Sequence, residues 1–159
     1  MRSVLAAILG MVLLLLLPLA ALEGIFRLLP VNTGLGTQPV TAEQPVMHFA
    51  ANRDFTYSRG WNFALINRGR LNNAGFVNDL DYQPQAGSPL LAVIGDSYVE
   101  ALMVPFEQTM QGRLARQLGQ RGRVYSFAAS GAPLSQYLVW DDHARRTYQR
   151  QMMAIVVIG

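Results

Sequence analysis

The chain has 159 residues, about the length of one domain, and contains no cysteine, which excludes disulfides and thiolate metal sites. Its thirteen basic residues are all arginine, and the net charge is +3. These arginines are spread along the chain and form no dense basic stripe with interleaved aromatics, so we expect no nucleic-acid partner.

The first element in chain order is an uncharged apolar segment, Val4–Leu22. As a helix it would extend about 28 Å, close to the thickness of the hydrocarbon core of a bilayer. The apolar part of a cleaved signal peptide is usually shorter, about 7–15 residues. We therefore expect residues 1–28 to be an N-terminal transmembrane helix that contacts the lipid bilayer through residues 4–22, with a cleaved signal segment as the alternative. The segment Glu23–Pro30 is expected to form a short interfacial helix.

Residues 29–52 are rich in Gly, Pro, Thr and Gln, a composition typical of a linker or of an extended arm lying across a domain. The domain itself is expected to cover residues 53–159. Near its beginning, the alternation of Trp61, Phe63 and Leu65 predicts a strand with one buried face. The polar sequence "INRGRLNNAG" that follows is typical of turns.

From Pro89 onwards the pattern alternates between apolar strands and amphipathic helices. The expected order is strand 90–95, a helix starting near Pro105, strand 124–129, helix 133–151 and strand 154–159. This is a βαβαβ arrangement, and right-handed crossovers would place both helices on a parallel three-stranded sheet. Because such a sheet needs cover on both faces and a strand ends the sequence, we expect the chain to be a truncated part of a longer protein.

The first apolar strand stops at Gly95-Asp96-Ser97. A serine just past the carboxyl end of a parallel strand lies where open α/β sheets bind their ligands. Gly95 would allow a sharp turn, and a helix starting at Ser97 would favour an oxyanion beside it. The simpler interpretation is that Asp96 or Ser97 only caps a helix.

Several segments resemble the SGNH/GDSL hydrolase superfamily. "AVIGDSYVEALMV" is similar to block I, in which Gly-Asp-Ser follows the first core strand. "VYSFAASGAPLSQ" is similar to block II, where Gly131 matches the glycine whose N–H contributes to the oxyanion hole. Ser126 and Ala128 depart from the asparagine and glycine that are common there. "MMAIVVIG" resembles the strand before block III, and "RLNNAGFVND" resembles a segment that precedes block I in membrane-anchored bacterial members.

The resemblance implies an α/β, partial flavodoxin-like (SGNH) three-layer fold. It also implies that Ser97 is the nucleophile, that the N–H groups of Ser97 and Gly131 form the oxyanion hole, and that Gly95 and Asp96 support them. The expected function is that of an exported, membrane-anchored esterase or O-acyltransferase. Its substrate would be an acylated small molecule or an envelope polysaccharide, and it would lie in the bacterial inner membrane with the domain in the periplasm or outside the cell.

The terminal Asp-x-x-His motif that supplies the base in this superfamily is missing, so we expect the chain as given to be inactive. Neither His48, in the arm, nor His143, on a helix away from the strand ends, is expected to replace that base. Glu100, three residues after Ser97, is a candidate site-lining carboxylate, but we favour its interpretation as a solvated capping-box partner. Asp141 and Asp142 are expected to pair with Arg145 and Arg146 on a solvated helix face that also carries His143.

We expect no metal and no cofactor, because two separated histidines and scattered carboxylates lack the spacing of metal ligands. The alternative function is a non-catalytic, membrane-tethered binding or assembly domain with the same sheet. A nucleotide-binding flavodoxin-like module is a third hypothesis, but no phosphate-binding glycine loop follows the first strand.

Overall fold

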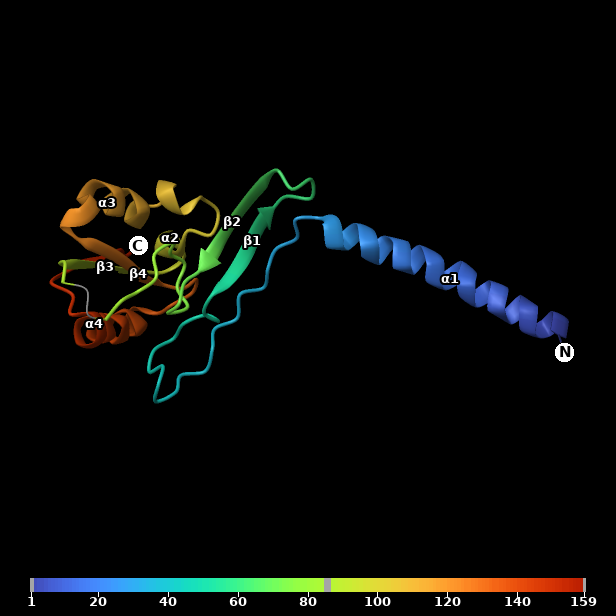
Figure 1. Cartoon of the computed structure of the whole chain (residues 1–159), viewed down its shortest axis with the longest axis horizontal. Helices are drawn as coiled ribbons and strands as arrows, with labels where there is room; N and C mark the ends of the chain where they lie inside the picture. The colour runs from blue at the N-terminus through green and yellow to red at the C-terminus, as the bar shows by residue number, and fades with distance from the viewer. Residues whose placement is uncertain (1, 85–86, 159) are drawn as a thin grey trace. The chain divides into compact units, whose positions relative to one another are not determined.

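The computed structural model describes residues 2–84 and 87–158, which form two compact units, Met1–Val31 and Asn32–Gly159 (Figure 1). The first unit consists of α1 (Arg2–Leu28). Its stretch Val4–Leu28 is long and apolar enough to cross a membrane. The expected separate interfacial helix is wrong, because α1 continues through Glu23 and Arg27, whose side chains form an ion pair one helical turn apart at 2.8 Å.

The second unit contains an antiparallel hairpin, β1 (Arg53–Arg59) and β2 (Leu65–Leu71). The strand expected at Trp61, Phe63 and Leu65 is wrong in its first part. Trp61 is 95% exposed and Phe63 has a φ of +54°, so both lie in the turn that joins the strands, and β2 begins only at Leu65. The sequence "INRGRL", which was expected to be a turn, forms most of β2.

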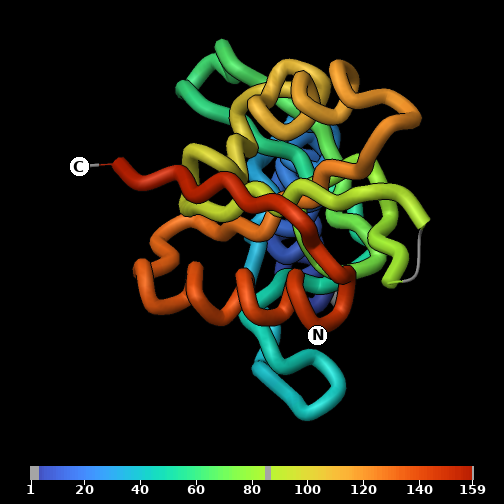
Figure 2. Tube along the Cα trace, turned by 90° about the vertical axis from the view of Figure 1, so that its left-hand side faces the viewer, coloured from blue at the N-terminus to red at the C-terminus, as the bar shows by residue number. Residues whose placement is uncertain are grey.

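The main sheet has three parallel strands in the order β4–β3–β5. These are β3 (Leu90–Gly95), β4 (Arg123–Ala128) and β5 (Met152–Ile155). Helix α3 (Met110–Leu118) packs against β4 and α4 (Leu134–Tyr148) against β3, on opposite faces of the sheet, as the two views show (Figures 1 and 2). The expected α/β class and parallel sheet are confirmed.

The strands bury apolar side chains on both faces, as the continuous apolar runs predicted. One core cluster, on the side of α4, includes Ala92, Ile94, Tyr125, Phe127, Trp140 and Tyr148. The other, on the side of α3, includes Val93, Val99, Val124, Ala128, Leu114 and Leu118. Because neighbouring residues of β3 and β4 belong to different clusters, the sheet separates the two halves of the core.

The helix expected from Pro105 starts later. A 3₁₀ turn, η1 (Phe106–Gln108), comes first, and the Thr109 hydroxyl then caps α3 by accepting from the Gly112 N–H at 3.1 Å. Helix α4 ends at Tyr148, three residues earlier than expected, because Gln149 adopts φ +55°. The last strand, β5, begins and ends earlier than expected, and the final residue of the expected strand, Gly159, lies outside the described residues.

The segment before the hairpin packs on the rest of the second unit. Thr33 and Thr56 exchange two hydrogen bonds, of 2.8 and 3.0 Å. Val46 and Phe49 are buried in the core, and the Trp140 indole N–H donates to the carbonyl of Met47 at 2.8 Å. Residues 33–49 are therefore fixed to the domain by backbone bonds and by apolar burial.

A loop between β2 and β3 covers the outer edge of β4. The Tyr82 hydroxyl accepts from the Ser126 N–H at 2.8 Å and donates to the Ser126 carbonyl at 2.6 Å. Asn78 donates to the Ser126 hydroxyl at 3.1 Å. Sheet edges expose unpaired backbone groups, and here the loop satisfies them in a buried setting. Ser126 thus has a structural role in this chain.

Candidate functional site

Ser97 lies at the carboxyl end of β3, as predicted, and is the first residue of α2 (Ser97–Glu100). The strand can turn directly into this helix because Gly95 has no side chain. A Cβ on Gly95 would lie 2.4 Å from a methyl carbon of Val99. A larger residue at position 95 would require the Val99 side chain or the helix to shift. Ser97 is partly exposed and lines a pocket.

Asp96 caps α2: its carboxylate accepts from the Tyr98 N–H at 3.0 Å. The capping interpretation is therefore correct for Asp96, while Ser97 begins the helix and does not cap it. With only four residues, α2 has a small dipole, so its N-terminus would stabilise an oxyanion only slightly. Any oxyanion at Ser97 would depend on individual N–H groups.

Gly131 lies in the loop that follows β4. Gly95 of β3 pairs with Ala128 of β4, so the loops that follow these two strands leave the sheet at the same, carboxyl-terminal end. The Ala132 N–H donates to the Ala129 carbonyl at 3.1 Å, and Gly131 has a φ of +78°. This geometry is that of a type II turn with glycine at its third position, where a positive φ is required. Among the hydrogen bonds of the described residues, none uses the N–H of Ser97 or Gly131.

Glu100 joins the two loops. The residue is 3% exposed, and one carboxylate oxygen accepts from the backbone N–H of Ser130 at 3.1 Å and also from the Ser130 hydroxyl. The interpretation of Glu100 as a solvated residue is therefore wrong. Burial raises its pKa, and the two hydrogen bonds from Ser130 oppose that rise. Because Glu100 follows Ser97 by three residues and Ser130 precedes Gly131, this contact holds the two candidate oxyanion-hole loops together.

Two further contacts fix the segment around Ser97. The buried Gln111 side chain of α3 donates to the Val99 carbonyl at 2.7 Å, near the end of α2. Asn67 of β2 donates to the carbonyls of Leu102 and Val104, at 2.8 and 2.9 Å. Sequence reasoning missed both residues, because each acts on backbone groups that are distant in the chain.

Neither histidine contacts Ser97 in the described structure. His48 is buried, with Nδ1 2.9 Å from the Val46 carbonyl. The ring of His143 packs edge-on against Phe127 and Tyr148, and burial lowers its pKa, with His48 as a second cause. His143 is thus half-buried against the sheet and does not lie on a solvated face.

The expected pairing of charges on α4 is partly correct. Asp142 pairs with both Arg145 and Arg146, each at 2.6 Å. Asp141 instead takes a bidentate contact of 2.5 Å from Arg150, which follows the helix.

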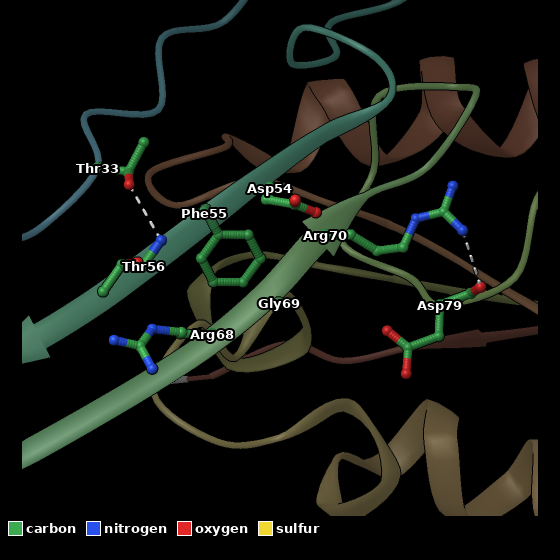
Figure 3. Close-up of a pocket in the computed structure, with 8 residues that line it drawn as sticks. All are labelled: Thr33, Asp54, Phe55, Thr56, Arg68, Gly69, Arg70 and Asp79. Carbon is green, nitrogen blue, oxygen red and sulfur yellow. Dashed lines mark hydrogen bonds between the residues drawn. The ribbon is translucent and has the colours of Figure 1, made fainter. Parts of the chain in front are cut away.

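A separate pocket lies on the hairpin and contains none of the predicted site residues (Figure 3). Its polar lining includes Asp54, Arg68, Arg70 and Asp79, and Arg70 donates to the Asp79 carbonyl at 3.4 Å and pairs with Asp81 at 2.7 Å. Arg70 lies opposite Asp54 in the strand register, an arrangement typical of a solvated sheet face. Within residues 2–84 and 87–158, no three histidine, aspartate or glutamate residues cluster as metal ligands would.

No protein-family model, curated protein or solved structure matches the chain.

Proposed function

We propose that this chain belongs to an exported, membrane-anchored serine esterase or O-acyltransferase of the SGNH type, with Ser97 as the nucleophile. The observation that supports the proposal best is the contact of Glu100 with Ser130, which ties the Ser97 helix to the Gly131 turn at one edge of the sheet. This contact fixes the turn after β4 relative to the segment that begins with Ser97.

In the proposed reaction the Ser97 hydroxyl oxygen attacks the carbonyl carbon of an ester while a base takes its proton. The N–H groups of Ser97 and Gly131 stabilise the oxyanion that forms. The ester's alcohol then leaves with a proton, and the acyl group remains on Ser97. Attack by water gives hydrolysis, and attack by a sugar hydroxyl gives acyl transfer.

The base is not supplied by His48 or His143 as they lie in the described structure, so the proposal requires a base from elsewhere in the whole protein. That requirement also favours the second candidate, a membrane-tethered binding or assembly domain that performs no chemistry. The two candidates share the fold and differ only in the reactivity of Ser97.

The test is labelling of the full-length translation product with a fluorophosphonate, in which the Ser97 oxygen bonds to phosphorus and fluoride leaves. We expect labelling of the wild type and none of Ser97→Ala. The matched control is Ser135→Ala, which removes an exposed hydroxyl from the first turn of α4 and should label normally. A folded wild type that stays unlabelled supports the non-catalytic candidate, and labelling that persists in Ser97→Ala rules out Ser97 as the nucleophile.

A further inference from the structure

A pocket of about 450 Å³ lies beside the candidate nucleophile. Its lining comes from both the hairpin and the segment that starts α2: Arg59, Ser97, Tyr98, Ala101, Met103 and Val104. Of these six described residues, Arg59 is the only charged one. The pocket is therefore mainly apolar. Its one cationic side chain, that of Arg59, is distant from Ser97 in the sequence.

The hairpin wall is held in place by Asn67, which is 7% exposed and binds the carbonyls of Leu102 and Val104. Arg59 pairs with Leu65 in the strand register, two residues before Asn67. Directly opposed residues, and residues two apart, share one face of a sheet. Arg59 is thus on the face of the hairpin from which Asn67 binds the 102–104 segment.

Arg59 has no partner of opposite charge among the described residues. The ion pairs there use Arg27, Arg70, Arg145, Arg146 and Arg150. The acids nearest to Ser97 in sequence are engaged elsewhere, since Asp96 caps α2 and Glu100 binds Ser130. An exposed guanidinium at the border of an apolar pocket is suited to bind a carboxylate or a phosphate in bidentate geometry.

We propose that the ester acted on at Ser97 carries an anionic group, a carboxylate or a phosphate, that Arg59 binds. The reaction at Ser97 rests on the proposed function, whereas the binding of the anionic group by Arg59 does not. Tyr98, Met103 and Val104 would contact the apolar part of the same ligand. Arg59 would be a substrate-binding residue that determines specificity and takes no part in the proton transfers.

The experiment compares 4-acetoxybutanoate with its amide, 4-acetoxybutanamide, as competitors of fluorophosphonate labelling on the full-length protein. The two molecules have nearly the same size and differ in charge. Because exposed ion pairs contribute little, we expect the wild type to prefer the acid by about two- to five-fold. Arg59→Met should abolish the preference, and Arg59→Lys should retain part of it. A third competitor, 2-acetoxyethyl phosphate, shows whether a phosphate is preferred to a carboxylate.

Arg53→Met is the matched control, because Arg53 is an exposed arginine at the other end of the same strand. It should keep the wild-type preference. Ser97 labelling with equal competition by acid and amide, or a preference that persists in Arg59→Met, overturns the role of Arg59 and leaves the proposed function intact.

If the wild type is not labelled, the proposed function fails and binding alone decides the role of Arg59. Ligand-observed saturation-transfer NMR with the same acid and amide is then the measurement. Stronger binding of the acid that is lost in Arg59→Met supports the anion site, and equal signals from both ligands exclude it.

Discussion

Replacing Ser130 with alanine removes the hydroxyl that donates to the buried carboxylate of Glu100 but keeps the backbone N–H that donates to the same oxygen. Glu100→Ala removes the acceptor of both bonds. A hydrogen bond to a charged group contributes about 1.5–3 kcal/mol. Ser130 is exposed, so water can replace part of the interaction, and we expect a coupling of about 1–1.5 kcal/mol between the two side chains.

The coupling is measured as a double-mutant cycle by urea denaturation of the whole chain in detergent micelles at pH 8, which favours ionisation of Glu100. Tryptophan fluorescence follows unfolding, because Trp140 is fully buried. The control cycle pairs Glu100→Ala with Ser135→Ala, which should be additive to within about 0.5 kcal/mol. We also expect faster hydrogen exchange at the Ser130 N–H in Glu100→Ala, because this N–H loses its acceptor. A Glu100–Ser130 coupling no larger than that of the control cycle would refute the idea that this contact holds the two loops together.

Three further predictions concern stability. Burial raises the pKa of Glu100, so the folded chain holds this proton more tightly than the unfolded chain does. The wild type should lose unfolding free energy relative to Glu100→Gln as the pH rises from about 4 through the raised pKa, as measured by urea denaturation across that range. Gly112→Ala would place a Cβ 2.0 Å from the Phe106 carbonyl oxygen. It should lower the unfolding free energy by about 1–3 kcal/mol, and an unchanged urea midpoint would contradict the close approach. Trp140→Phe removes the bond to the Met47 carbonyl and leaves a small cavity. It should cost about 1–3 kcal/mol and increase hydrogen exchange in residues 46–49, which calorimetry and exchange measurements would check.

The central strands could be predicted from the sequence because their signal is local. Leu90–Gly95 is a continuous apolar run of six residues bounded by Pro89 and Asp96, as a short strand buried on both faces requires. The apolar helix α1 is predictable for the same reason, since a bilayer-length segment without charges contains all the information within itself.

The hairpin could not be predicted because its determinants lie far apart in the chain. The polar strand β2 is stabilised by Asn67, whose amide binds backbone carbonyls 35 and 37 residues further on. Nothing around Asn67 indicates those partners, and its polar neighbours are typical of turns. The aromatic alternation at Trp61 and Phe63 indicated a strand, but the left-handed backbone of Phe63 places both residues in a turn.

The candidate site also combines features that have a local sequence signal with features that depend on distant contacts. The positions of Ser97 and Gly131 at the ends of adjacent strands follow from the βαβ pattern and from the turn-forming glycine. The role of Glu100 does not, because its partner Ser130 is thirty residues away and the local spacing equally fits a capping box. Long-range contacts of this kind become visible only once the sheet places the two loops side by side.

The exposed strand β5 has consequences for handling the 159-residue chain. β5 pairs with β3 along one side, and no other described strand pairs with it. Its exposed apolar side chains continue past the strand end: Met152, Met153, Ile155, Val157 and Ile158. Exposed apolar edge strands pair with strands from other molecules, so concentrated preparations of this chain should form oligomers. Light scattering would detect them as an increase in turbidity. Replacing Ile155 with lysine should delay that association while leaving the Ser97 loop unchanged, since charged residues on an edge oppose strand addition.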